Sequence, residues 1–215
     1  MMPIGAAQAG YRAAIPRGKA LRPETSVGGM GYDVRPVTPQ RWADLLGLFG
    51  PNGGYANCWC MWWRVPHREF EGERNRAALE RLVAEGREPG LLAYDHDRPV
   101  GWVAVAPLPE FGRVFRSRTL KPAPDDPTDQ IWSINCFVIR RDARRKGVAS
   151  ALLDAAVAHA AEHGARLVEG YPVNTGSARM PAAELYTGTL EMFRRAGFRE
   201  VEGRTGKRVL ARRTV

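Results

Sequence analysis

A chain of 215 residues with a formal net charge of +9 and 44% hydrophobic residues has enough apolar side chains for a buried core. Its longest apolar runs are far too short to span a membrane, and its first residues lack the apolar stretch of a signal peptide. Three cysteines do not make a disulfide framework, so a cytoplasmic location is expected. The positive charge suits an anionic ligand, and equally nucleic acid.

The first 31 residues contain alanine, glycine, proline and scattered basic residues without periodicity. They are predicted to form a flexible basic tail, which is solvated or contacts an acidic partner. The remaining residues, 32–215, are predicted to form a single domain. Its first half is predicted to contain a strand, two amphipathic helices and a two-stranded hairpin, at 32–37, 39–49, 69–85, 91–94 and 100–105.

The second half of the domain begins with a long loop rich in proline, arginine and aspartate, at 107–130. Loops of that length are uncommon unless they are functional or disordered. β-Branched and aromatic residues then predict a strand over 131–139, and the apolar period from Val148 predicts a helix. The remaining predicted elements are a strand at 166–173, a helix that ends near 198 and two strands within 199–212. This order is typical of a mixed α/β sandwich.

The turn between the 131–139 strand and the helix at Val148 is the most informative part of the sequence. Gly147 stands where the helix begins, and five basic residues precede it. A helix N-terminus exposes unpaired backbone N–H groups and a partial positive charge, and glycine lets an anion approach them closely. The turn is therefore predicted to bind a phosphorylated ligand. The five basic residues are Arg140, Arg141, Arg144, Arg145 and Lys146.

The motif Arg144-x-x-Gly147-x-Ala149 resembles the Arg/Gln-x-x-Gly-x-Gly/Ala signature of the GNAT superfamily of N-acetyltransferases. The run Met192-Phe-Arg-Arg-Ala-Gly-Phe198 is similar to the Leu-Tyr-x-x-x-Gly-Phe of the same family, and the resemblance covers roughly residue 32 to the C-terminus. It implies an α/β fold with a mixed, mostly antiparallel sheet flanked by helices. It also implies acetyl-CoA as the co-substrate and no metal.

The resemblance assigns residues to that co-substrate. In the family, the strand before the turn offers backbone groups to the pantetheine arm, and the turn offers N–H groups and cations to the pyrophosphate. In this sequence these positions are Cys136, Phe137, Val138, Arg144, Arg145, Lys146, Gly147, Val148 and Ala149.

The residues for proton transfer depart from the family pattern. The family often uses a tyrosine, four residues before the glycine of its Gly-Phe pair, to protonate the leaving thiolate. That position is Phe193 here, which has no proton to give and is predicted to pack in the core. Tyr186 stands where the family usually has an asparagine and is the nearest chemical substitute, about two helical turns away. Alternatively, the thiolate leaves without a dedicated acid and is protonated by water.

Glu169 is the first candidate for the general base. It stands in the middle of an apolar strand, where burial would raise the pKa of its carboxyl group toward the range that a base needs. The alternative is a structural glutamate bonded to neighbouring backbone, or one that faces outward. Ser133 and Asn135, which alternate on the preceding strand, are candidates for binding the acceptor or a water, as is Tyr171.

The stretch Cys58-Trp-Cys-Met-Trp-Trp-Arg64 contains three tryptophans and two cysteines. Cys-x-Cys with one further cysteine in the chain is a poor zinc set, so no metal site is expected. The tryptophans, Trp59, Trp62 and Trp63, form either an aromatic wall for a cationic amine or part of the core. Two histidines of the helix after the turn, His159 and His163, are expected at the surface.

These features predict an acetyl-CoA-dependent N-acetyltransferase that transfers acetyl directly to an amine, as a monomer or homodimer. Partial cover by the tryptophan-rich stretch and the long loop favours a small-molecule acceptor over a protein lysine or N-terminus. Alternatives of another class are a non-catalytic acyl-CoA-binding domain and a basic nucleic-acid-binding module. Nucleic acid is the weaker alternative, because the sequence has no recognisable binding motif and its arginines lie where a cofactor fits better.

Overall fold

The computed structural model describes residues 31–176, 180–202 and 206–215 of the chain. Apart from Gly31, the predicted N-terminal tail lies outside the described residues, as does most of the predicted turn at 203–206. Among the helices that the structure does describe, none combines the length and the apolar character needed to cross a bilayer.

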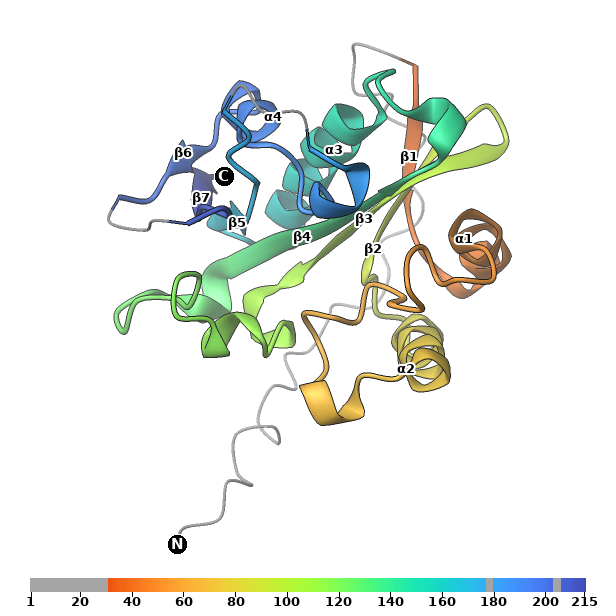
Figure 1. Cartoon of the computed structure of the whole chain (residues 1–215), viewed down its shortest axis with the longest axis horizontal. Helices are drawn as coiled ribbons and strands as arrows, with labels where there is room; N and C mark the ends of the chain where they lie inside the picture. Colours follow the sequence, from red (N-terminus) through yellow and green to blue (C-terminus); the bar gives the residue numbers. More distant parts are fainter. Residues whose placement is uncertain (1–30, 177–179, 203–205) are drawn as a thin grey trace, which may run out of the picture.

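The centre of the protein is a sheet of seven strands, in the order β1-β2-β3-β4-β5-β7-β6 (Figure 1). Strands β4 and β5 pair in parallel, and the other pairs are antiparallel. The predicted mixed, mostly antiparallel sheet is therefore confirmed. The strands are β1 Asp33–Pro36, β2 Gly90–Asp95, β3 Arg98–Pro107, β4 Ile131–Ile139, β5 Leu167–Gly170, β6 Arg199–Glu200 and β7 Ala211–Thr214.

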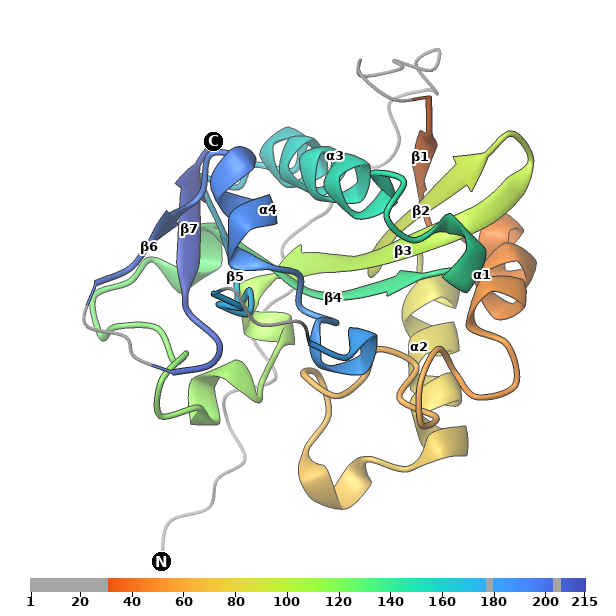
Figure 2. The same cartoon turned by 45° about the horizontal axis from the view of Figure 1, so that its top comes forward.

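Helices cover both faces of the sheet, with α1 and α2 on one side and α3 and α4 on the other (Figure 2). Strand alternation sorts the core accordingly. Val103 and Val105 of β3 belong to the cluster under α3, whereas Trp102 and Ala104 pack with α1 and α2. The helices are α1 Trp42–Phe49, α2 Gly72–Ala84, α3 Val148–Glu162 and α4 Leu190–Arg195.

Helix α3 lies unusually close to the sheet. A Cβ atom on Gly101 of β3 would lie 2.6 Å from Val148 and 2.9 Å from Leu152, so glycine allows this approach. The apolar positions predicted for the buried face of α3 are buried. The expectation for His159 was wrong, because its ring is buried at 8% exposure beside Trp132, whereas His163 is exposed.

Three other elements differ from the prediction. Helix α2 starts three residues late, because a 3-10 turn, His67–Glu69, precedes it. The 107–130 loop contains three 3-10 turns and buries side chains such as Phe111 and Leu120 in a core cluster of its own. Strand β5 ends at Gly170 instead of continuing to 173.

Strands β4 and β5 diverge where β5 ends. Their last paired residues are Ile134 and Gly170. At the same level the β3–β4 register skips one residue, which leaves Asn135 unpaired in a bulge. The ring of Phe193 from α4 fills the space above Gly170, where an added Cβ would lie 2.3 Å from it. Phe193 is fully buried, as predicted.

A buried ionic network lies on the opposite side of this divergence. Arg212 of β7 donates to Glu169 Oε2 at 3.0 Å and to both carboxylate oxygens of Asp126 at 2.8 and 2.6 Å. The other oxygen of Glu169 accepts from the Tyr171 hydroxyl at 2.6 Å, and that hydroxyl accepts from Ser133 Oγ at 3.1 Å. Every oxygen of the two carboxylates is thus bonded, which is the condition for keeping such groups buried.

We predict that Arg212→Met destabilises the protein by about 3–5 kcal/mol, because it leaves Glu169 buried without its cation. The measurement is the free energy of unfolding in urea. Arg195→Met is the matched control, since Arg195 is exposed and pairs with Glu191 one helical turn away; it should change the free energy by less than about 0.5 kcal/mol. Equal losses in the two variants would show that the network does not stabilise the fold.

Candidate active site

The N-terminus of α3 has the geometry of an anion site. Its N-cap residue, Gly147, has a left-handed φ of 84°, and no side chain of the described residues caps it. Arg145 also has a positive φ, of 62°. Alternation of this kind turns successive N–H groups toward a common point, and the first N–H groups of the helix have no intrahelical partner. The sequence prediction of a phosphate-sized anion site thus has the backbone it requires.

Basic side chains surround this turn with little neutralisation. Asp142 accepts from Arg98 at 3.0 Å and from Arg140 at 3.3 Å, and the two arginines lower the pKa of its carboxyl group. Arg144 donates from Nε to the carbonyl oxygen of Ile139 at 3.2 Å, which holds its guanidinium against the end of β4. The local charge near the N–H groups therefore stays positive.

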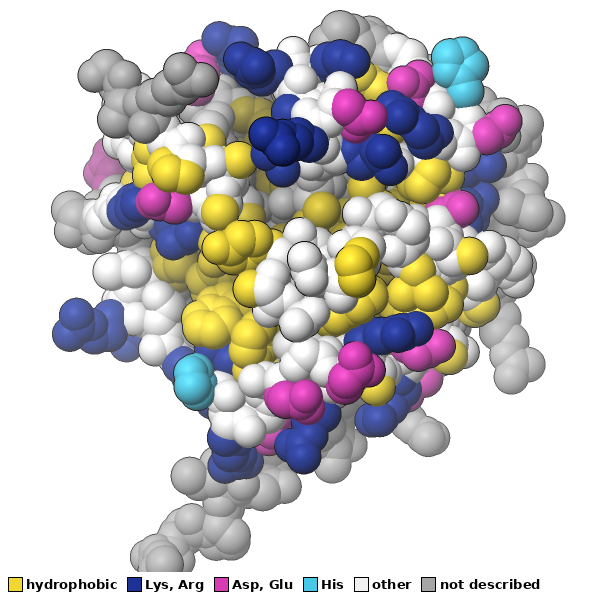
Figure 3. All heavy atoms as spheres, turned by 45° about the vertical axis from the view of Figure 1, so that its right-hand side comes forward, with side chains coloured by type: hydrophobic (Ala, Val, Ile, Leu, Met, Phe, Trp, Pro, Cys, Tyr) yellow, Lys and Arg dark blue, Asp and Glu magenta, His cyan; other side chains and the backbone are white. Residues whose placement is uncertain are grey.

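A cavity of about 920 Å³ extends from this helix N-terminus along β4. Figure 3 shows hydrophobic side chains gathered in a hollow of the surface, with Lys and Arg side chains along one side of it. Eight of the nine residues predicted to bind the co-substrate line the cavity. The exception is Lys146, whose carbonyl oxygen accepts from the Tyr32 hydroxyl at 3.0 Å. The eight are Cys136, Phe137, Val138, Arg144, Arg145, Gly147, Val148 and Ala149.

The end of the cavity away from the arginines has aromatic and thiol side chains. Trp62 and Trp63 line it, whereas Trp59 packs in the core, 5.7 Å from the ring of Phe49. The expectation of substrate contact was therefore wrong for Trp59, which is a core residue, whereas Trp62 and Trp63 are part of the cavity wall. The outer ring face of Trp62 is already used, because the guanidinium of Arg113 stacks 3.9 Å from the ring centroid.

Three thiols belong to the same wall. Cys58, Cys60 and Cys136 line the cavity, and Cys60 and Cys136 place their sulfur atoms 2.9 Å apart. Trp102 donates from Nε1 to the sulfur of Cys60 at 3.2 Å. Burial raises the pKa of Cys60 well above its usual value and raises the pKa of Cys58 to about 11. Both thiols therefore remain protonated at neutral pH.

Tyr186 reaches the cavity from the segment between β5 and α4. The prediction put it on the α4 helix, but α4 starts at Leu190 and Tyr186 lies in the turn before it. Its carbonyl oxygen accepts from the backbone N–H of Phe137 at 2.6 Å, and its ring lies under the guanidinium of Arg208 at 4.8 Å. Burial raises the pKa of its hydroxyl, so the phenol keeps its proton.

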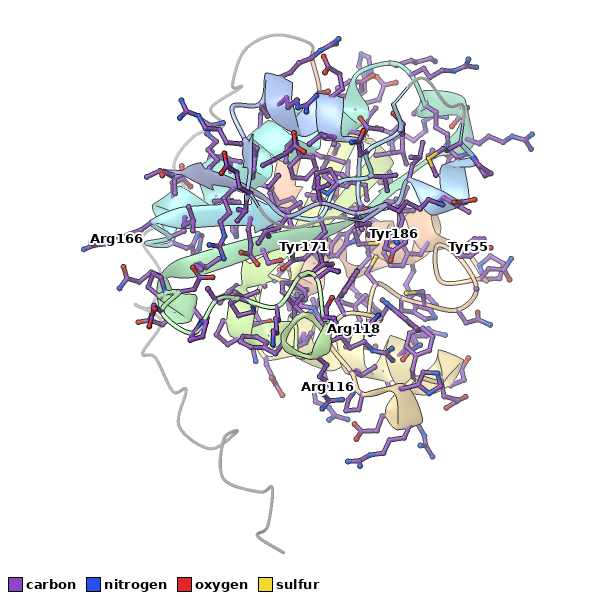
Figure 4. All side chains as sticks on the ribbon, turned by 60° about the vertical axis from the view of Figure 1, so that its left-hand side comes forward. Tyr55, Arg116, Arg118, Arg166, Tyr171 and Tyr186 are labelled. Atoms are coloured by element: carbon purple, nitrogen blue, oxygen red, sulfur yellow. The ribbon has the colours of Figure 1, made fainter. Side chains whose placement is uncertain are left out.

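The other predicted acceptor residues lie behind the cavity wall. Glu169, Tyr171, Ser133 and Asn135 are fully buried and do not line the cavity. Burial raises the pKa of Glu169, although its bonds to Tyr171 and Arg212 oppose the shift. Figure 4 shows Tyr171 beside β4 and Tyr186 farther along, on the side of Tyr55. The ring of Trp63 packs 5.6 Å from Tyr171 and separates it from the cavity.

Two buried polar groups in this region have no hydrogen-bond partner among the described residues. They are the side-chain amide of Asn135, in the β4 bulge, and Nε1 of Trp63, in the cavity wall. Buried polar groups are rarely left unpaired, because each costs about 1–3 kcal/mol. The wall of the cavity at Trp63 and the β4 bulge behind it thus have hydrogen-bonding capacity that the described residues do not use.

Sequence reasoning missed the segment that closes the cavity before α4. Leu185, Gly188, Thr189 and Met192 all line it. The sequence signal was a glycine followed by a threonine, Gly188-Thr189, which is typical of a helix start. In the structure Gly188 has a φ of 82°, and the Thr189 hydroxyl caps α4 by accepting from the Met192 N–H at 3.3 Å. Recognising that cap would have ended the helix there and left Tyr186 in the preceding turn.

A helix N-terminus with the geometry of an anion site thus lies at one end of a long, largely apolar cavity. The sequence model described as "Acetyltransferase (GNAT) family" matches residues 57–188, which is more than half of the chain. The chain belongs to this family of acetyltransferases, which uses acetyl-CoA as its co-substrate. No curated protein matches the sequence significantly.

Solved structures share the fold. A GCN5-related N-acetyltransferase from Kribbella flavida is 18% identical, with 86% of this chain and 98% of that chain covered and a TM-score of 0.51. An acetyltransferase from Thermus thermophilus is also 18% identical, with the same coverage and a TM-score of 0.50. An N-acetyltransferase from Staphylococcus aureus is 12% identical, with 85% and 96% covered and a TM-score of 0.50.

We predict that Gly147→Asp abolishes CoA binding, because it puts a carboxylate where the phosphates would lie. Calorimetric titration with CoA measures the effect. Gly164→Asp is a matched control, since Gly164 has nearly the same φ, 83° against 84°, at the other end of the same helix. Both variants carry the same backbone strain, so only Gly147→Asp should lose affinity. Unchanged CoA affinity in that variant would contradict the anion site.

Proposed function

We propose that this protein is an acetyl-CoA-dependent N-acetyltransferase that transfers acetyl directly to the amine of a small molecule. The observation that carries the proposal is the continuity of the cavity, from the uncapped N-terminus of α3 to the Trp62 and Trp63 wall. The backbone around Gly147 and the side chain of Arg145 would hold the pyrophosphate. The thioester supplies an activated acetyl group, and the protein holds the amine beside it.

Direct transfer is preferred over an acetylated enzyme because of the state of the cysteines. A covalent intermediate needs a thiolate, and the raised pKa values of Cys58 and Cys60 keep these groups as thiols. No histidine or lysine side chain lies among the groups that shift the pKa of either thiol, so neither cysteine has such a group to activate it as a nucleophile. The amine itself is then the nucleophile.

Tyr186 is proposed as the group that protonates the departing thiolate. It lines the cavity close to Phe137, and its raised pKa keeps the proton available at neutral pH. The Arg208 guanidinium over its ring would stabilise the phenolate formed after the proton has left. Phe193, at the position that the family pattern favours, is buried in the core and excluded by its chemistry.

Glu169 is proposed as an indirect proton acceptor. The Tyr171 hydroxyl donates to it and accepts from Ser133 Oγ, so a proton from the amine would pass through Ser133 and then Tyr171 before it reaches Glu169. Arg212 positions the carboxylate and favours its ionised form. The unpaired amide of Asn135 is proposed to bind the acceptor or the water that begins this relay.

The cavity wall also indicates the class of acceptor. Among the described residues that line the cavity, the charged side chains are those of Arg144 and Arg145. None of these lining residues is an aspartate or a glutamate. Polycationic amines need acidic partners, whereas apolar and aromatic walls bind an apolar body. We therefore propose a monoamine with an apolar or aromatic body.

Release of free CoA from acetyl-CoA, measured with a thiol reagent against a panel of amines, tests this function. Aromatic and alkyl monoamines should give turnover well above that of polyamines, aminoglycosides and lysine peptides. CoA binding without turnover on any amine would support a non-catalytic acyl-CoA-binding domain instead. Preference for lysine peptides would overturn the small-molecule proposal but keep the acetyltransferase.

We predict that Tyr186→Phe lowers kcat by about 10²-fold, because the leaving thiolate loses its proton donor while the ring that fills the cavity wall is kept. CoA affinity should be unchanged. Tyr55→Phe is the control: Tyr55 also lines the cavity but is 68% exposed, and its loss of a hydroxyl should leave kcat within a few-fold. Phe193→Tyr should also stay within a few-fold. A kcat that survives in Tyr186→Phe would show that water protonates the thiolate.

We predict that Glu169→Gln lowers kcat by about 10²–10⁴-fold with little change in CoA affinity. In the wild type, activity should fall as the pH falls through the raised pKa of Glu169, since the carboxylate must be ionised to accept a proton. That acidic limb should be absent in the variant. The melting temperature is measured beside kcat: a lower melting temperature with kcat retained per folded molecule would show that Glu169 is structural.

A further inference from the structure

A cluster of three potential ligands lies at the C-terminal end of α3, at the opposite end from the anion site. His159 and His163 come from the last turns of the helix, and Glu88 comes from the segment between α2 and β2. Oε2 of Glu88 lies 3.5 Å from Nε2 of His159 and 3.7 Å from Nε2 of His163. None of the three lines the acetyl-CoA cavity, and none takes part in the chemistry proposed above.

The helix itself brings the two histidines together. Residues four apart lie on the same face of a helix, and the two imidazole rings are 4.1 Å apart by their centroids. The ring of Trp132 packs against both, at 5.6 Å from His159 and 5.5 Å from His163. One side of the cluster is thus shielded by an aromatic wall, while His163 keeps the other side open to solvent.

The hydrogen bonding fixes which atom of His163 is free. Its Nδ1 lies 2.7 Å from the backbone carbonyl oxygen of His159, which can only accept, so Nδ1 carries the proton. The lone pair is then on Nε2, the atom that faces Glu88. A metal-binding histidine is usually held in this way, with the second ring nitrogen donating to a carbonyl.

His159 adds a buried atom without a partner. Its Nε2 has no hydrogen bond among the described residues, although the side chain is about nine-tenths buried. A carboxylate oxygen and two imidazole nitrogens thus converge on one point.

We propose that Glu88, His159 and His163 form a binding site for a divalent transition metal of the zinc class. The three ligand atoms all lie within 4.8 Å of one another. Zinc bonds of about 2.0–2.2 Å place tetrahedral ligands about 3.4 Å apart, and Glu88 Oε2 already lies 3.5 and 3.7 Å from the two imidazole nitrogens. Two imidazoles and one carboxylate leave a fourth position for water. The ion would tie the end of α3 to the segment that leads into β2.

The protein is first treated with a chelator and then titrated with zinc chloride in a calorimeter. The expected result is one saturable site with a dissociation constant in the micromolar range or below, together with a higher melting temperature when zinc is present. His163→Ala should weaken binding at least tenfold, as should Glu88→Gln, which keeps the shape of the side chain but removes its charge.

The chain offers a matched control, because it has four histidines and the other two, His67 and His96, lie elsewhere. The double variant His67→Ala/His96→Ala should bind zinc like the wild type. The absorption spectrum of the Co²⁺ form identifies the donor atoms: the proposed site gives nitrogen and oxygen ligation, without a charge-transfer band from a cysteine thiolate. Absence of saturable zinc binding, unchanged affinity in both His163→Ala and Glu88→Gln, or a thiolate band would each overturn the proposal.

Discussion

The parting of β4 from β5 after Ile134 and Gly170 is the constraint on which the rest of the structure depends. A parallel pair that stays together would close the sheet and leave no room for a ligand between its strands. Because these two diverge, the edge of β4 that faced β5 has no strand partner beyond the bulge at Asn135 and lines the cavity, while its other edge stays paired with β3. Phe193 fills the gap on one side, and the Glu169–Arg212 network fills it on the other. The cavity is what remains between these two packings and the N-terminus of α3.

The local parts of this arrangement could be predicted from the sequence. Helical periodicity indicated the buried face of α3, and the glycine at the start of that helix indicated the left-handed turn of the candidate anion site, because both depend on residues within a few positions of each other. The parts that depend on distant contacts could not. The burial of His159 on α3 depends on Trp132 of β4. The position of Glu169 behind the cavity wall depends on Trp63 and Arg212. The burial of Glu169 was predicted correctly, but the residues that contact it were not.

The tryptophan-rich stretch shows the same limit within seven residues. Trp59 packs in the core, whereas Trp62 lines the cavity and has the guanidinium of Arg113 over its ring. Trp63 packs on Tyr171 with its ring and also lines the cavity. Positive φ angles at Trp59 and Cys60 make the chain change direction there, so neither a helical nor a strand period applies. Composition could indicate an aromatic wall but could not say which ring belongs to it.

The Phe137 N–H already bonds the Tyr186 carbonyl oxygen, so that donor is free for a ligand only in molecules in which this bond is open. A ligand that stops short of Phe137 binds the protein as it stands. A longer ligand that takes the same N–H must first select the molecules in which this backbone hydrogen bond is open. An internal hydrogen bond is worth about 0.5–1.5 kcal/mol, so this selection weakens the apparent affinity about 2- to 13-fold. Fragments of CoA ordered by length should therefore gain affinity steadily until they reach Phe137, and then gain less than their added contacts alone would give.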